Sequence, residues 1–180
     1  MLYENPAGMK PTVADSATVH KDAKIIGNVY IGDNVYIGPN AVIRADEPCL
    51  EGSIEGIVVE SGVFIQDGVI IHALNGTLVR IGKRATLAHE TVVIGPCDVG
   101  ENCFIGFKSL VFKAILGKGV VVQHQALVEW VSIREAKEVP AMATILTPKD
   151  ASELKPVSGD STILSDQVRC ANSINGGSQQ

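Results

Sequence analysis

The chain has 180 residues, which suits one domain with an ordinary buried core, and its formal net charge of −5 argues against the basic patch that nucleic-acid binding requires. No apolar run reaches the roughly 18 residues of a membrane span, and the segment from Met1 to Lys10 does not have the layout of a signal peptide. We therefore expect a cytoplasmic protein without nucleic-acid or membrane partners.

The composition favours strands around a narrow core. Val and Ile are abundant, aromatic residues make up only 4% of the chain, and 18 glycines provide for many turns. Stiff β-branched side chains favour β structure, whereas a sheet protein of this size usually fills its core with more rings.

Aliphatic residues recur every six positions through the first three quarters of the chain. This is the period of a hexapeptide β-helix, in which three hexapeptides form one coil of about 18 residues. The sequence thus predicts an all-β protein, a parallel β-helix of hexapeptide repeats. The anchors are Val13, Val19, Ile25, Ile31, Ile37 and Ile43, then Val59, Ile65 and Ile71, then Ile81, Leu87, Val93, Val99, Ile105 and Val111, and a slipped set of Leu116, Val122 and Val128.

We expect the period to end near Val128 and residues 131–147 to form an irregular exit, so that the β-helix domain covers residues 1–147. Residues 148–180 are expected to form a C-terminal helical tail packed on the β-helix. Helices are predicted over about residues 148–155 and 160–171, with Asp160 or Ser161 as the cap of the second.

Two breaks interrupt the six-residue period, and their lengths determine which residues lie above one another on neighbouring coils. Ile43 to Ile65 and Ile71 to Val93 each span 22 residues, which we interpret as one coil plus a four-residue bulge. Residues 22 apart should then stack, which gives three pairs: Arg44 with Gln66, Asp67 with His89, and His72 with Ile94.

Polar residues beside the anchors form an expected cluster on the outer face of the prism. Because side chains alternate along a strand, residues next to an inward anchor point outward. One interpretation of the cluster is a salt-bridge network at a subunit interface. The other is a functional site in a cleft, whose walls neighbouring subunits of a trimer would supply. Its members are Arg44, Asp46, Glu47, Gln66, Asp67, His72 and His89.

Five segments resemble γ-class carbonic anhydrases over about residues 10–150. The resemblance implies a left-handed β-helix, a homotrimer, and a metal held between adjacent subunits by three histidines, with zinc, iron or cobalt as the candidates. It also implies reversible hydration of CO2 to bicarbonate by metal-bound hydroxide. The segments are IRADE (43–47), IQDGVIIHAL (65–74), LAHETVVIGP (87–96), NCFIGFKSLVF (102–112) and VPAMATI (139–145).

The resemblance is incomplete at the metal ligands. His72 matches the first ligand and His89 the ligand supplied across the interface, but the third position holds Ile94. Catalytic zinc normally has three protein ligands and a water, and isoleucine has no lone pair to donate. We therefore expect a metal that is weakly bound or missing.

Other family residues are present. Arg44 and Asp46 resemble the inter-subunit ion pair, and Gln66 resembles the residue that hydrogen-bonds the metal-bound water. Glu47 resembles an active-site carboxylate and Asp67 the orienting carboxylate. The fullest members of the family also carry a long acidic loop after the first histidine, with a glutamate that shuttles protons. Here the short segment 72–76 turns back within a few residues and lacks this loop.

Three functions remain open from the sequence. The first is a carbonic anhydrase with impaired or no hydratase activity, acting on CO2 and bicarbonate. The second is a non-catalytic trimeric binding or assembly subunit of the same family, which Ile94 favours. The third is a hexapeptide acyltransferase with His89 or His124 as general base, which the motifs favour least.

Overall fold

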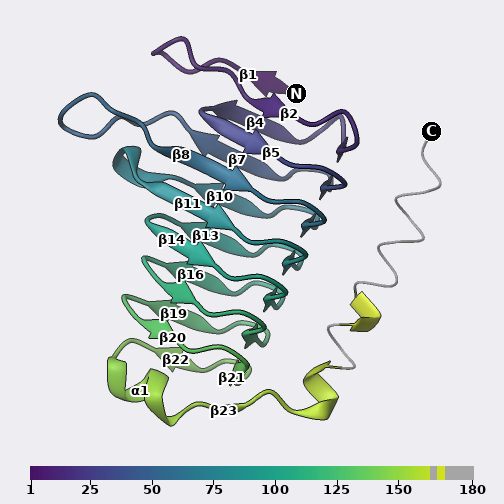
Figure 1. The fold of residues 1–180 in the computed structure, drawn as a ribbon, viewed down its shortest axis with the longest axis vertical. Coiled ribbons are helices and arrows are strands. Elements are labelled where there is room, and N and C mark those ends of the chain that lie inside the picture. Colours follow the sequence, from purple (N-terminus) through teal and green to yellow (C-terminus); the bar gives the residue numbers. More distant parts are fainter. Residues whose placement is uncertain (163–165, 169–180) are drawn as a thin grey trace.

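Short strands stack into a parallel β-helix in the structure, a computed structural model that describes residues 1–162 and 166–168 (Figure 1). The predicted parallel β-helix of hexapeptide repeats, followed by a C-terminal helical segment, is confirmed. Three sheets form its walls, and the chain visits them in turn.

The first sheet contains β1 (Leu2–Tyr3), β4 (Lys24–Gly27), β7 (Val42–Ala45), β10 (Ile70–His72), β13 (Val92–Ile94), β16 (Leu110–Phe112), β19 (Leu127–Glu129) and β22 (Thr144–Ile145). The second contains β2 (Thr12–Val13), β5 (Val29–Ile31), β8 (Gly56–Val59), β11 (Leu78–Ile81), β14 (Cys97–Val99), β17 (Ile115–Leu116) and β20 (Ser132–Ile133). The third contains β3 (Thr18–Val19), β6 (Tyr36–Ile37), β9 (Phe64–Ile65), β12 (Thr86–Leu87), β15 (Phe104–Ile105), β18 (Val121–Val122), β21 (Lys137–Val139) and the antiparallel β23 (Lys155–Pro156).

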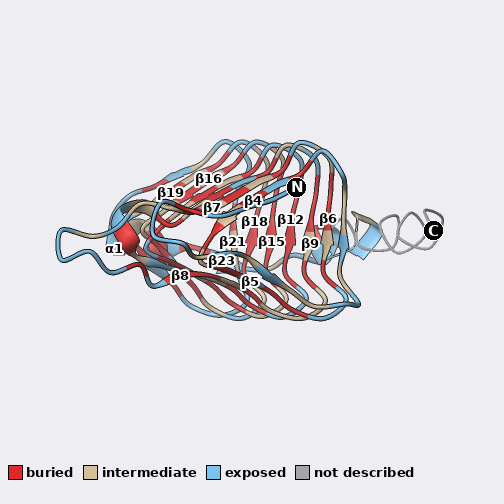
Figure 2. Ribbon diagram, turned by 90° about the horizontal axis from the view of Figure 1, so that it is seen from above, coloured by how far each residue is buried: buried red, intermediate tan, exposed pale blue. Residues whose placement is uncertain are grey.

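The six-residue anchors line the interior of the prism. Ile25, Ile43 and Ile71 are each fully buried and stack on one another in the first sheet. Figure 2 shows buried strands around the axis and exposed residues on the turns. Among the described residues the main core cluster contains no aromatic ring, and buried Phe104 belongs to a separate cluster. The narrow core therefore accounts for the low aromatic content.

The predicted stacking of Arg44 with Gln66 is wrong. Ile43 pairs with Ile71, 28 positions later, so the first break inserts ten residues rather than four. Arg44 consequently pairs with His72, while Ile65 pairs with Ile37 on the third sheet. A six-residue period cannot distinguish four inserted residues from ten. The insertion, residues 46–55, forms the loop that protrudes between β7 and β8 in Figure 1.

The second break has the predicted length. Ile71 pairs with Val93, and His72 pairs with Ile94, as expected for a four-residue bulge. The bulge contains the 3-10 turn η1 (Leu74–Gly76).

The repeat continues beyond Val128, contrary to the prediction of an irregular exit. Val128 pairs with Ile145 in β22, and β20 and β21 complete the same coil. These later coils are one residue shorter, since Val111 pairs with Val128, 17 positions on. Lys113 and Trp130 adopt positive φ in the shortened turns.

A short helix, α1 (Pro148–Glu153), follows the last coil. Its buried residue Ala151 and the following residue Leu154 join the main core. Lys155, predicted to end this helix, instead pairs with β21 as part of β23.

Residues 159–162 and 166–168 are also helical. The cap of this second segment is Ser158, whose hydroxyl accepts a hydrogen bond from the Ser161 amide at 3.2 Å, rather than Asp160 or Ser161. Val157 and Val168 pack against the cluster around Phe104. The rest of the predicted second helix lies outside the described residues. No helix among the described residues has the length and apolar character needed to cross a membrane.

Candidate functional site

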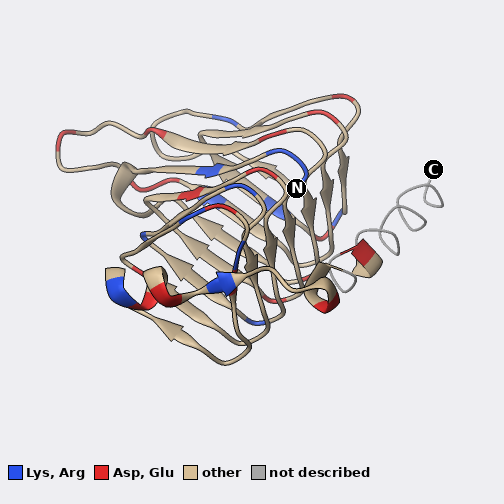
Figure 3. Cartoon of the chain, turned by 60° about the horizontal axis from the view of Figure 1, so that its bottom comes forward, with Lys and Arg blue, Asp and Glu red and all other residues tan. Residues whose placement is uncertain are grey.

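Two predicted site residues and Ile94, the position without a ligand, lie side by side on neighbouring strands. Arg44, His72 and Ile94 occupy equivalent positions of β7, β10 and β13, because parallel pairing aligns the residue after each anchor. Asp46 and Glu47 follow directly after β7, at the start of the protruding loop. Figure 3 shows that charged residues are concentrated on such turns and edges of the prism.

Arg44 and Asp46 form a bidentate ion pair within the chain. Arg44 Nε donates to Asp46 Oδ1 at 2.8 Å, and Nη2 donates to Oδ2 at 3.0 Å. The hydrogen bond to Asp46 is the main cause that raises the pKa of the Arg44 guanidinium above its usual value. The pair is partly buried, so this edge carries a fixed cation whose charge Asp46 balances.

Glu47 faces His72. Glu47 Oε1 lies 3.2 Å from His72 Nε2 and 3.6 Å from Arg44 Nη2. The His72 side chain is only 15% exposed, and its Nε2 is buried without a hydrogen bond of good geometry to any described residue. An imidazole nitrogen in this state usually needs a partner, because burial of an unsatisfied polar atom is costly.

The loop after β10 fixes the other oxygen of Glu47. The amide of Asn75 donates to Glu47 Oε2 at 3.3 Å, and Asn75 has a positive φ of 52° within the η1 turn. Gly76 follows with φ 71°, and a Cβ there would lie 2.4 Å from the Ser53 carbonyl oxygen, so only glycine fits. The two loops also border a groove of about 660 Å³ lined by residues from 48–55 and 75–77.

The remaining predicted residues lie at a different corner, between the third and first sheets. Asp67 Oδ2 is 3.7 Å from His89 Nδ1, which confirms the predicted stacking of these two residues. Gln66, one position earlier, is 6% exposed. His89 is half-exposed, and the nitrogen that lies nearest Asp67 is Nδ1.

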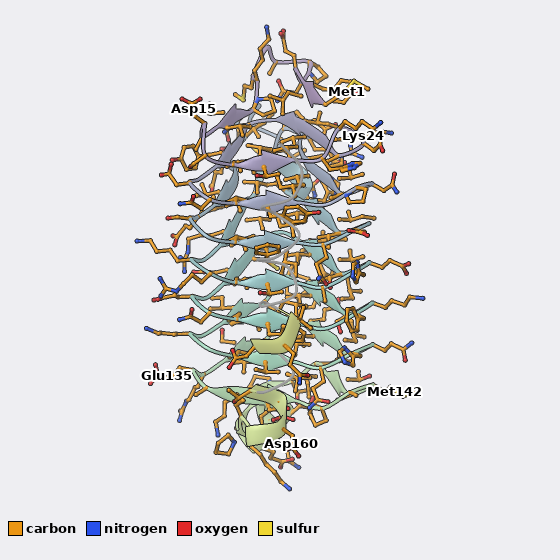
Figure 4. All side chains as sticks on the ribbon, turned by 90° about the vertical axis from the view of Figure 1, so that its right-hand side faces the viewer. Met1, Asp15, Lys24, Glu135, Met142 and Asp160 are labelled. Carbon is orange, nitrogen blue, oxygen red and sulfur yellow. The ribbon has the colours of Figure 1, made fainter. Side chains whose placement is uncertain are left out.

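An aromatic stack extends this corner along the prism. The His89 ring stacks on Phe107 with centroids 5.7 Å apart, and Phe107 stacks on His124 at 4.6 Å. Burial lowers the pKa of His124. Met142, labelled in Figure 4, lies beside this stack, since its amide donates to the His124 carbonyl, and it is 76% exposed.

One chain does not bring the two histidines together. His89 precedes Ile94 by five residues, a path on the order of 10–15 Å, and His72 lies beside Ile94 on the next strand. Two ligands of one metal lie within about 4 Å of each other. Consistent with this separation, the described part of the chain contains no cluster of three or more potential metal-binding side chains.

Comparison with known proteins places the chain in a family. The family model described as Bacterial transferase hexapeptide (six repeats) matches residues 10–45, and Hexapeptide repeat of succinyl-transferase matches residues 28–73 and 96–123. Carboxysome assembly protein CcmM from Nostoc sp. is 39% identical over 81% of this chain, which corresponds to 27% of that protein. Carbonic anhydrase from Methanosarcina thermophila is 31% identical over 87% of this chain and 68% of that protein. The chain belongs to the γ-carbonic anhydrase-like family.

Solved structures agree with the fold of this γ-carbonic anhydrase-like chain. A hexapeptide transferase family protein from Anaplasma phagocytophilum superposes with a TM-score of 0.75 and 22% identity, covering 99% of this chain and 98% of that one. At this identity the similarity concerns the fold alone.

Sequence reasoning missed two features of this γ-carbonic anhydrase-like chain. The first is the Asn75 amide that holds Glu47; the Asn-Gly pair at 75–76 is a turn signal that could have indicated it. The second is a cation–π pair in which Lys113 Nζ lies 4.2 Å from the ring centroid of Trp130, a side chain 62% exposed. No sequence motif indicated that pair, because it depends on the shortened coils.

Proposed function

We propose that this chain forms a homotrimer that binds a divalent metal between adjacent copies and hydrates CO2 slowly, because Ile94 occupies one ligand position. The observation that carries this proposal is the division of the site within one chain. One corner presents His72, whose buried Nε2 lies 3.2 Å from Glu47 Oε1 without a hydrogen bond of good geometry among the described residues, and another presents His89, whose Nδ1 lies 3.7 Å from Asp67 Oδ2. The corner of a second copy, placed against the first sheet, would join the two halves.

The residues present, imidazoles and carboxylates, fit zinc, iron or cobalt. When bound, a metal of this kind lowers the pKa of a coordinated water and supplies a nucleophile for CO2 near neutral pH. Asp67 orients the imidazole of His89 through Nδ1, as carboxylates do for metal-binding histidines. Arg44 and Asp46 form a rigid charged edge beside His72. Gln66, next to Asp67 in the sequence, supplies an amide that could orient CO2 or bicarbonate.

Ile94 is the reason for the reduced rate. Ile94 lies beside His72 in the first sheet, and the next residue in the column is Phe112 on β16. Both side chains are apolar, so neither can bind a metal where the family has an imidazole. Fewer protein ligands weaken metal binding and leave less of the enzyme in its active form.

The first test combines oligomeric mass with CO2 hydration kinetics. We expect a trimer in solution and weak hydration by the unmodified chain. Ile94→His, which adds an imidazole beside His72, should raise the metal-dependent kcat/KM at least tenfold. Ile115→His is the matched control, because Ile115 is 55% exposed on the second sheet, away from the site. A monomer, or equal rates for the unmodified chain and Ile94→His at the same limiting concentration of added metal, would contradict the proposal.

A second candidate, a non-catalytic assembly subunit, is favoured by the same apolar residue. One similar protein is named as a carboxysome assembly protein, but this chain matches only about a quarter of it. A trimer in which neither the unmodified chain nor Ile94→His hydrates CO2 would support this role over catalysis.

A further inference from the structure

The contact between Glu47 and His72 suggests how the site compensates for Ile94. Glu47 Oε1 is 3.2 Å from His72 Nε2. Tetrahedral zinc with bonds of about 2.0–2.2 Å separates its ligand atoms by roughly 3.3–3.5 Å. The two atoms are therefore already spaced almost as two ligands of one metal would be, and they come from the same chain.

The Glu47 carboxylate can accept a cation, because the neighbouring Arg44 guanidinium is hydrogen-bonded to Asp46. Asp46 holds the Arg44 guanidinium in two hydrogen bonds, so Arg44 approaches Glu47 only at 3.6 Å. The Asn75 amide binds Oε2 and directs Oε1 toward His72. Ligating carboxylates are commonly held by such a hydrogen bond on the second oxygen.

The charge of this edge also favours a cation. Asp46 balances Arg44, which leaves the Glu47 carboxylate as the additional negative charge beside a buried nitrogen that has no hydrogen-bond partner of good geometry among the described residues. Two histidines and one carboxylate form a known ligand set for zinc and for iron.

We propose that Glu47 is the third protein ligand of the metal, together with His72 of the same chain and His89 of a second copy, and so replaces the imidazole missing at Ile94. This inference rests on the proposed function, because it requires the trimer. It assigns to Glu47 a direct bond to the metal. An anionic ligand in place of a neutral imidazole makes the metal a weaker acid toward water, which agrees with slow hydration at neutral pH.

The experiment measures metal binding in the full-length trimer by calorimetry with Zn²⁺ and by the visible absorption of Co²⁺. The unmodified chain, stripped by chelator, should bind one ion per chain and give the intense bands of low-coordinate Co²⁺. Glu47→Gln should weaken the affinity at least tenfold and reduce those bands. Adding Ile94→His to Glu47→Gln should restore both. Glu60→Gln is the control, since Glu60 forms an ion pair with Arg80 at 3.0 Å on the second sheet and should leave binding unchanged.

Three outcomes would overturn the inference. Unchanged affinity in Glu47→Gln would show that the carboxylate is not a ligand. Binding by Ile94→His but not by the unmodified trimer would show that Glu47 does not complete the site and that the unmodified chain does not hold the metal, while the trimer and the positions of His72 and His89 would stand. No binding by either trimer would contradict both the inference and the proposed metal site. Thermal unfolding and oligomeric mass of Glu47→Gln identify a variant that fails to fold, and in that case Glu47→Asp, too short to reach His72, serves as the second variant.

Discussion

Side chains that follow a buried anchor face outward along the first sheet, and their identity sets the chemistry of that edge. Arg44, His72, Ile94 and Phe112 occupy the same column, one per strand. The backbone is equivalent at each position, so the difference between a cation, an imidazole and an apolar surface depends on the residue alone. The step from His72 to Ile94 replaces an imidazole by a hydrophobic side chain.

His124 provides a pH-dependent contribution to stability at the residue scale. Its Nδ1 accepts a hydrogen bond from the Phe107 amide at 3.1 Å, which requires the neutral imidazole, and burial lowers its pKa. In the unfolded chain the pKa returns to about 6.5, so acidification protonates the unfolded chain first. We expect this stabilisation to be complete above about pH 6.5 and to be lost as the pH falls from there toward the folded-state pKa.

Thermal unfolding between pH 7.5 and 5.5 checks this expectation. The unmodified chain should lose more stability over this range than His124→Asn, whose amide oxygen can still accept from Phe107 but does not titrate. Equal losses in both proteins would show that His124 does not contribute.

At the scale of elements, the end of the β-helix is closed by α1. Thr147 Oγ1 accepts from the Asp150 amide at 3.2 Å, and Asp150 Oδ2 accepts from the Thr147 amide at 2.9 Å, which forms a capping box. Pro148 fits the first helical turn because its position needs no amide donor. Hydrogen bonding to Thr147 lowers the pKa of Asp150. The cap holds Ala151 and Leu154 over the last coil.

Loss of the cap should be measurable. Thr147→Ala should destabilise the protein by about 1 kcal/mol, because one amide of the first turn loses its side-chain acceptor. Thr144→Ala, at an exposed position of β22, is the control of the same residue type and should change stability by less than about 0.5 kcal/mol. Urea denaturation at one protein concentration compares the two, and equal effects would argue against a role for the capping box.

For the whole molecule, stability comes from stacking, since each coil buries its apolar side chains against the coils on either side. Ile105 is fully buried in a central coil and lies between Leu87 and Val122 in the third sheet. A cavity there would remove contacts with both neighbours, because close packing limits how far the coils can collapse.

Ile105→Ala should therefore cost about 2–5 kcal/mol. Ile115→Ala removes the same atoms from a side chain that is 55% exposed and should cost less than about 1 kcal/mol. Both free energies of unfolding should be measured at fixed concentration, because association would contribute to them. Similar costs at the two positions would contradict stacking as the source of stability.

Much of the architecture follows from local sequence. The six-residue period of Val and Ile determines alternation between wall and turn, and it identifies the buried anchors from Ile25 to Val128. The second break was also predictable, and with it the pairing of His72 with Ile94 and of Asp67 with His89, because a bulge of four residues leaves the coil order unchanged. The same interval of 22 residues predicted the wrong pairing at the first break, so the structure was needed to distinguish the two.

The tertiary structure determined those residue pairings that the spacing of the repeat leaves ambiguous. The register is defined only modulo six, so the ten-residue insertion before β8 could not be distinguished from four, and the partner of Arg44 was His72 rather than Gln66. The contact of Glu47 with His72 depends on how the loops 46–55 and 73–77 meet, which no repeat encodes. The sequence by itself determined the β-helix and placed an isoleucine, Ile94, beside His72; only the folded loops brought the Glu47 carboxylate within 3.2 Å of that histidine.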